Sequence, residues 1–149
     1  MPLTATLQQA AQELQEDHRR LHERIDRLAL AGDLAEMSAG LASLHERLAA
    51  HFDAEEKPGG LYDALGVCAS EFRLSLGQLV DDHFRLAALL RHLCEWARTA
   101  SGTDADALRA DVARFLKALG QHEQRELELA RRASRPGTGA PAVSGRTPP

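Results

Sequence analysis

Apolar residues recur at intervals of three, four or seven along most of the chain, which is the spacing of one face of an α-helix. Four such stretches predict helices over residues 4–30, 33–56, 68–98 and 103–132. Gly32 and Asp33 separate the first two stretches, the run Lys57-Pro58-Gly59-Gly60 ends the second, and Ser101-Gly102 ends the third. A short turn or a single helical turn is expected over residues 61–65.

Four amphipathic helices joined by short connections predict an all-α protein, an up-down-up-down antiparallel four-helix bundle over residues 1–133. At a rise of 1.5 Å per residue, each helix would be about 35–45 Å long. Thr103 and Asp106, which lie three residues apart, resemble a capping box with Asp in place of Glu. From Ser134 onward Pro, Gly, Ser and Thr dominate, so residues 134–149 are predicted to form a disordered tail.

Composition and charge narrow the class of protein. Hydrophobic residues make up 44% of the chain but aromatic residues only 4%, so the core is expected to consist mainly of Leu and Ala. The net charge of −4, with acidic and basic residues interleaved, offers no basic surface for nucleic acid. No apolar run approaches the length of about 20 residues that a membrane span needs. With no signal peptide and only two cysteines, a cytoplasmic protein is expected.

The seven histidines are the unusual feature of the composition, because several fall on the apolar faces of the predicted helices. The second and fourth helices each carry a His followed four residues later by a Glu, and such residues lie about 40° and 6 Å apart. The first and third helices each carry one inward His. The two halves of the chain therefore look alike, which predicts an internal two-fold repeat. The candidate metal ligands are His18, His51, Glu55, His83, His122 and Glu126.

Inward carboxylates and imidazoles call for a compensating partner, because an ionised carboxylate is almost never buried unpaired. Imidazole and carboxylate ligands together suit iron, manganese or zinc rather than calcium or magnesium. Two carboxylates that face each other can bridge two cations, whose charge they partly neutralise. The alternative is a metal-free helical interaction module in which the histidines are hydrogen-bonded core residues.

Four short motifs carry a resemblance to a known family. They are DHRRLH around His18, HFDAEE around His51, DHFRL around His83 and HEQRE around His122. In these motifs the chain resembles the hemerythrin-like family, also called the HHE cation-binding domain, over residues 14–129. The family pattern is His, His-x-x-x-Glu, His and His-x-x-x-Asp/Glu on four successive helices.

The resemblance implies a centre of two non-haem iron ions joined by an oxo or hydroxo bridge. On the family pattern His18 and His51 would hold one iron, and His83 and His122 the other. Glu55 and Glu126 would bridge the two. A ferritin-like di-iron oxidase is the second alternative, but that class uses Glu together with Glu-x-x-His, at a spacing of three.

The third helix departs from the oxygen-carrying members of the family, which have a His-x-x-x-His pair there. The residues four before and four after His83 are Leu79 and Ala87. The missing imidazole would leave an open or water-filled position at the metal, as catalytic sites have. We therefore expect a protein that binds or senses dioxygen, peroxide, nitric oxide or iron itself. Sensing and catalysis need the same open position, so the pattern favours neither.

Three further residues have alternative roles. His22, four residues after His18, is either an additional ligand or a hydrogen-bond partner near the centre. Glu56 is an additional ligand, a partner of a ligand imidazole, or a surface charge at the end of its helix. Tyr62 either donates a hydrogen bond to a metal-bound oxygen species or packs as a plug over the bundle.

Overall fold

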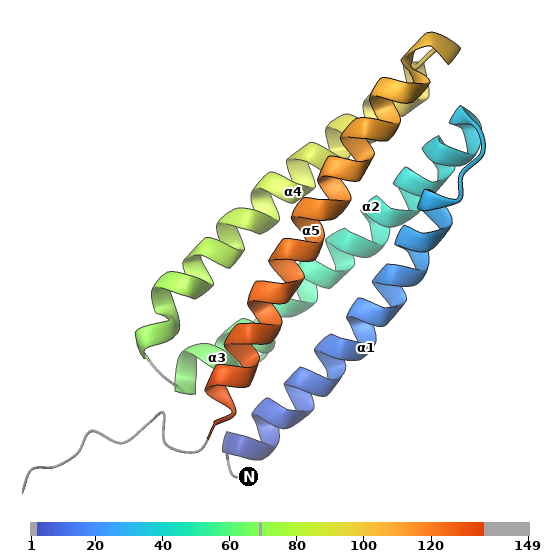
Figure 1. Ribbon diagram of the computed structural model, residues 1–149. Coiled ribbons are helices and arrows are strands. Elements are labelled where there is room, and N and C mark those ends of the chain that lie inside the picture. The colour runs from blue at the N-terminus through green and yellow to red at the C-terminus, as the bar shows by residue number, and fades with distance from the viewer. Residues whose placement is uncertain (1–2, 69, 136–149) are drawn as a thin grey trace, which may run out of the picture.

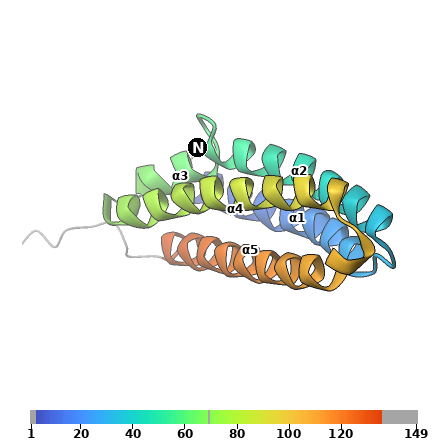
Figure 2. The same cartoon turned by 90° about the horizontal axis from the view of Figure 1, so that it is seen from above.

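The computed structural model describes residues 3–68 and 70–135, and over these residues all regular structure is helical. Four long helices, α1 (Leu3–Ala29), α2 (Leu34–Glu56), α4 (Arg73–Thr99) and α5 (Ala105–Ala133), alternate in direction and lie side by side (Figure 1). Each packs against two neighbours, in the cyclic order α1, α2, α4, α5 (Figure 2). The predicted up-down-up-down four-helix bundle is confirmed. None of the described helices has the length and apolar character needed to cross a bilayer.

Between α2 and α4 the structure differs from the sequence prediction. Residues 61–65 were expected to form no more than one turn, but they begin the eight-residue helix α3 (Leu61–Cys68). The next long helix was expected from residue 68, but it starts at Arg73 after a 3-10 turn, η1 (Ser70–Phe72). A short helix is marginal by itself, and α3 gains stability by packing across the end of the bundle against all four long helices.

The capping box before α5 lies two residues earlier than expected. Ser101 and Asp104 form it, in place of Thr103 and Asp106. The Ser101 backbone N–H donates to the Asp104 carboxylate at 2.8 Å. The reason is a 3-10 turn, η2 (Gly102–Asp104), which precedes α5 and brings Asp104 back to the start of the turn. The predicted tail of residues 134–149 lies outside the described residues, apart from its first two.

Two glycines shape the turn that ends α2 and begins α3. Gly59 has a φ of +79°, a left-handed conformation that side chains disfavour. At Gly60 an added Cβ would lie 2.6 Å from the carbonyl oxygen of Ala54 and 2.7 Å from that of Glu55. Only glycine permits this close approach. The turn thereby directs α3 over the end of the bundle (Figure 1). Tyr62 lies in the first turn of α3.

The core consists of two apolar clusters with a polar layer between them. On α1, His18 lies between Leu14 of one cluster and Leu21 of the other, and α4 and α5 repeat this order. The larger cluster includes Leu21, Leu41, Leu44, Leu48, Leu90, Leu93, Phe115 and Leu119. The smaller cluster is made of Leu7, Leu14, Leu61, Tyr62, Leu65, Phe72, Leu79 and Leu129. The polar layer is therefore shielded from water along the bundle axis in both directions.

Two glycine substitutions are expected to change stability in opposite directions. Gly60→Ala should lower the free energy of unfolding by about 1–3 kcal/mol, because the new Cβ collides with backbone carbonyls. Gly77→Ala in α4 should raise it by about 0.5–1 kcal/mol, because Gly77 is exposed, has nothing within 4 Å of its added Cβ and gains helix propensity. Urea denaturation followed by circular dichroism measures both. A neutral Gly60→Ala would contradict the close approach.

Candidate metal centre

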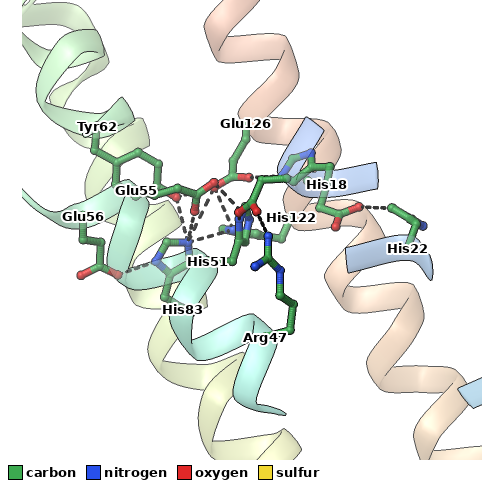
Figure 3. A network of polar contacts seen from close by, with 12 residues as sticks. His18, His22, Arg47, His51, Glu55, Glu56, Tyr62, His83, His122 and Glu126 are labelled. Atoms are coloured by element: carbon green, nitrogen blue, oxygen red, sulfur yellow. Dashed lines mark hydrogen bonds and ion pairs between the residues drawn. The ribbon is translucent and has the colours of Figure 1, made fainter. Parts of the chain in front are cut away.

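The polar layer contains all six residues that the sequence singles out as candidate ligands. They project from the four long helices toward one another, as Figure 3 shows. All six are buried, with exposed fractions between 0% and 6%. The i, i+4 spacing in α2 and α5 places the imidazole and the carboxylate of each pair on the same inward face. The residues are His18, His51, Glu55, His83, His122 and Glu126.

Their donor atoms form two overlapping groups, and within each group the atoms lie no more than 4.8 Å apart. Each group has two imidazoles of its own and shares the same two carboxylates. One group contains His18 and His51, the other His83 and His122, and both include Glu55 and Glu126. This arrangement provides two adjacent positions for cations, with carboxylates between them.

The two glutamates each face histidines of both groups. Glu55 Oε1 lies 3.1 Å from His51 Nε2, and Glu55 Oε2 lies 3.3 Å from His83 Nε2. Glu126 Oε1 lies 3.1 Å from His122 Nε2, and Glu126 Oε2 lies 3.3 Å from His18 Nε2. One oxygen of each carboxylate is therefore available to each group, as a bridging ligand requires.

Several of these inward atoms have no hydrogen-bond partner. They are Nε2 of His18, Nε2 of His51, both oxygens of Glu55 and one oxygen of Glu126. Some lie within ion-pair distance of each other, but their angles are not those of hydrogen bonds. Each unpartnered buried polar atom lowers the stability of the fold by about 1–3 kcal/mol. Five such atoms in one layer therefore favour a bound metal, because a metal ion accepts lone pairs from nitrogen and oxygen. A metal pair fits this donor set.

Burial and mutual contacts shift the pKa values of the layer in different directions. Burial raises the pKa of Glu55 to about 9. Burial also acts to raise the pKa of Glu126, but the close contacts with His122, His18 and His83 outweigh it and hold that pKa well below its usual range. For His83, burial acts to lower the pKa, but its contacts with Glu126 and the other carboxylates raise it to about 9. Burial lowers the pKa of His51. Without a metal, bound protons therefore offset the negative charge of the buried carboxylates. A bound cation would displace these protons and offset the same charge.

Three of the four histidines also contact a carboxylate through their other ring nitrogen. Asp17 Oδ2 lies 2.5 Å from His51 Nδ1, and Asp82 Oδ2 lies 3.4 Å from His122 Nδ1. A carboxylate that accepts the Nδ1 proton fixes the tautomer and turns Nε2 toward the metal position. Sequence reasoning missed both aspartates. The signal was present, because each immediately precedes the inward His of the neighbouring helix, in the repeated pair Asp-His.

An arginine completes each of these two contacts. Arg47 pairs with Asp17, and Arg125 Nη2 lies 2.7 Å from Asp82 Oδ2. The order arginine, aspartate, histidine therefore occurs once in each half of the bundle. This correspondence agrees with the internal repeat that the sequence suggests.

Glu56 and His22 differ in how they relate to the centre. Glu56 contacts His83 Nδ1, so of its three expected roles the structure shows that of a partner to an inward imidazole. His22 lies outside both groups, and its Nε2 is 2.7 Å from the buried Glu123. Because His22 lies about 40° around the helix from His18, its side chain points toward α5 and is half exposed. Neither of the roles expected for His22 at the centre is therefore observed.

Tyr62 reaches the centre from α3. Its hydroxyl donates to Glu126 Oε1 at 2.5 Å and lies 2.9 Å from His83 Nε2. Burial and the nearby carboxylates raise the pKa of this phenol, so it keeps its proton. The ring also belongs to the smaller apolar cluster, and the ring of Phe52 stacks on that of His83 at 3.8 Å between centroids. Tyr62 thus covers the centre and presents a polar group to it.

Comparison with known proteins agrees with this geometry. The family model of the hemerythrin HHE cation-binding domain matches residues 9–130, which is most of the chain. The chain therefore belongs to this family. Neither the comparison with curated proteins nor that with solved structures gives a match.

Loss of the Asp82 carboxylate is expected to weaken metal binding without removing a ligand. Asp82→Asn should lower the affinity about 10–100-fold, because His122 loses the acceptor that orients it. The neighbouring Asp81 is exposed, so Asp81→Asn is the matched control and should bind metal as the wild type does. Competition with a coloured chelator measures both affinities. Equal affinities for the two variants would show that Asp82 plays no part.

Proposed function

We propose that the protein is a non-haem di-iron protein that binds or senses a small molecule such as dioxygen or peroxide. The pair of overlapping His/Glu groups that share Glu55 and Glu126 carries this proposal. His18 and His51 would hold one iron, and His83 and His122 the other. The two glutamates would bridge the irons, since each offers one oxygen to either group.

The donor set supports iron as the metal. Imidazole nitrogens and carboxylate oxygens suit iron, manganese and zinc, and the absence of thiolate from both groups disfavours a structural zinc site. Membership in the HHE cation-binding family supports the same choice. Each group has two imidazoles and two shared carboxylates, which leaves room in an iron coordination sphere for an oxo or hydroxo bridge and an external ligand.

The bound irons would supply the redox chemistry and an open position for the small molecule. The chain would supply the environment. Asp17, Asp82 and Glu56 orient three imidazoles, and the apolar clusters above and below shield the layer from water along the bundle axis. The Tyr62 hydroxyl oxygen lies 2.5 Å from Glu126 Oε1, so its O–H is placed to donate a hydrogen bond to an oxygen atom in the layer.

The third helix favours peroxide binding or sensing over reversible oxygen transport. In this helix, α4, His83 is the single inward imidazole, since Leu79 belongs to the smaller apolar cluster and Ala87 has no donor atom. The second metal position therefore has one imidazole fewer than oxygen-carrying members of the family provide. Tyr62, which approaches His83 within 2.9 Å, lies beside that position.

Metal content tests the proposal directly. Elemental mass spectrometry of freshly purified protein should find about two irons per chain. His122→Ala should lose at least one of them, because the second group keeps a single imidazole. His92 is exposed on α4, so His92→Ala is the control and should retain the wild-type content. No metal in a folded wild-type chain would favour the interaction module, and zinc as the main metal would refute the redox function.

Removal of the metal is expected to destabilise the bundle. A ligand at a thousandfold excess over its dissociation constant contributes about 4 kcal/mol to the free energy of unfolding. Thermal denaturation with and without a strong chelator measures this contribution, and added iron should restore the original Tm. Glu126→Gln, which removes a bridging charge, should show little response to the chelator. An unchanged Tm for the wild type would mean that the four helices need no cation.

A further inference from the structure

The buried centre has one described opening toward solvent. A cavity of about 470 Å³ lies between α1, α2 and the turn that precedes α3. His51 and Glu55, both nearly inaccessible to solvent, line its inner end. Its outer wall consists of exposed residues, among them Glu13, Ala50 and Ala54. We call it the α1–α2 cavity.

The opening reaches the centre beside His51 and the shared Glu55. The α1–α2 cavity reaches His51, which belongs to the group with His18. The four other cavities described in the chain are lined by none of the six candidate ligands. The half with His83 is covered by the rings of Tyr62 and Phe52. Solvent therefore approaches the layer from the His18–His51 side.

The walls of the α1–α2 cavity combine small and charged side chains. Ala50 and Ala54 are one turn apart on α2, and their methyl groups leave the passage wide. Asp17 of α1 and Arg47 of α2 pair across it, and their side chains are 26% and 29% exposed. A water molecule occupies about 30 Å³ in the liquid, so a cavity of this size accommodates several molecules of that size.

We propose that the α1–α2 cavity is the route by which metal ions and small ligands of a few atoms reach the centre. They arrive first at the half formed by His18 and His51. The inference rests on the proposed metal centre, whose six residues are otherwise shielded by the two apolar clusters. Because Asp17 contacts both Arg47 and His51, the Asp17–Arg47 pair lies beside the inner end of the route.

A route affects rates in both directions and leaves equilibria unchanged, which gives the inference a specific test. Ala54→Phe places a ring in the passage, and Ala50→Leu places a smaller group one turn earlier. The matched control is Ala49→Phe, on the same helix but exposed and outside the cavity lining. The probes are iron(II), loaded into metal-free protein, and azide, added to the ferric protein. Elemental analysis of samples quenched with a chelator follows the iron loading, and absorption spectroscopy follows the azide binding.

Ala54→Phe should slow iron loading and azide binding about tenfold or more, a barrier increase that a partly blocked passage readily produces. Ala50→Leu should slow them less. The final iron content and the azide dissociation constant should match those of the wild type, and Ala49→Phe should match it in rates as well. Circular dichroism establishes that each variant is folded. If Ala54→Phe does not fold, the loading and azide-binding rates of Ala50→Leu test the route.

Two different results separate the route from the centre itself. Wild-type rates in folded Ala54→Phe and Ala50→Leu, with full iron content, would overturn the route and leave the metal centre in place. A wild-type chain that binds no iron would overturn the proposed function instead. Slower rates in Ala49→Phe as well would also overturn the route, because that side chain lies outside the cavity.

Discussion

The burial of two carboxylates among four imidazoles is the constraint on which this bundle depends. An ionised carboxylate in an apolar interior is tolerated only when charge and hydrogen bonds compensate it. Here the compensation within the chain is incomplete, since both oxygens of Glu55 and one of Glu126 have no hydrogen-bond partner. The pKa shifts of the two glutamates have the same origin: burial raises the pKa of Glu55, whereas contacts with the histidines lower that of Glu126. Cations held between them would resolve it, and the packing of the four helices positions the residues of both groups around that point.

The fold provides rigidity on both sides of this layer. Leucine-rich clusters fill the bundle above and below, so the helices cannot shift past the layer without opening a cavity in one cluster. The glycine turn after α2 places Tyr62 of α3 over the polar layer. Because Gly60 allows the backbone to pass close to the end of α2, Tyr62 reaches across to Glu126 and His83. The hydrogen bond from Tyr62 to Glu126 therefore depends on the tight turn at Gly60.

The two halves of the centre share a plan but differ in access. In each half an Asp that precedes one inward His orients the His of the next helix, and an Arg holds the Asp. One half opens to the α1–α2 cavity, whereas the other is enclosed by Tyr62 and Phe52. Corresponding candidate ligands therefore lie in unequal surroundings, His51 beside the cavity and His83 beside the two rings.

The sequence by itself determined the helices, their inward faces and the six candidate ligands, because helical periodicity depends on neighbours only three or four residues away. It did not determine α3, since that short helix is stabilised by packing across the end of the bundle. Nor did it reveal that Asp17 orients His51, that Glu56 contacts His83 or that His22 faces Glu123. These contacts join residues 27 to 101 positions apart, so only the packing of the helices decides them.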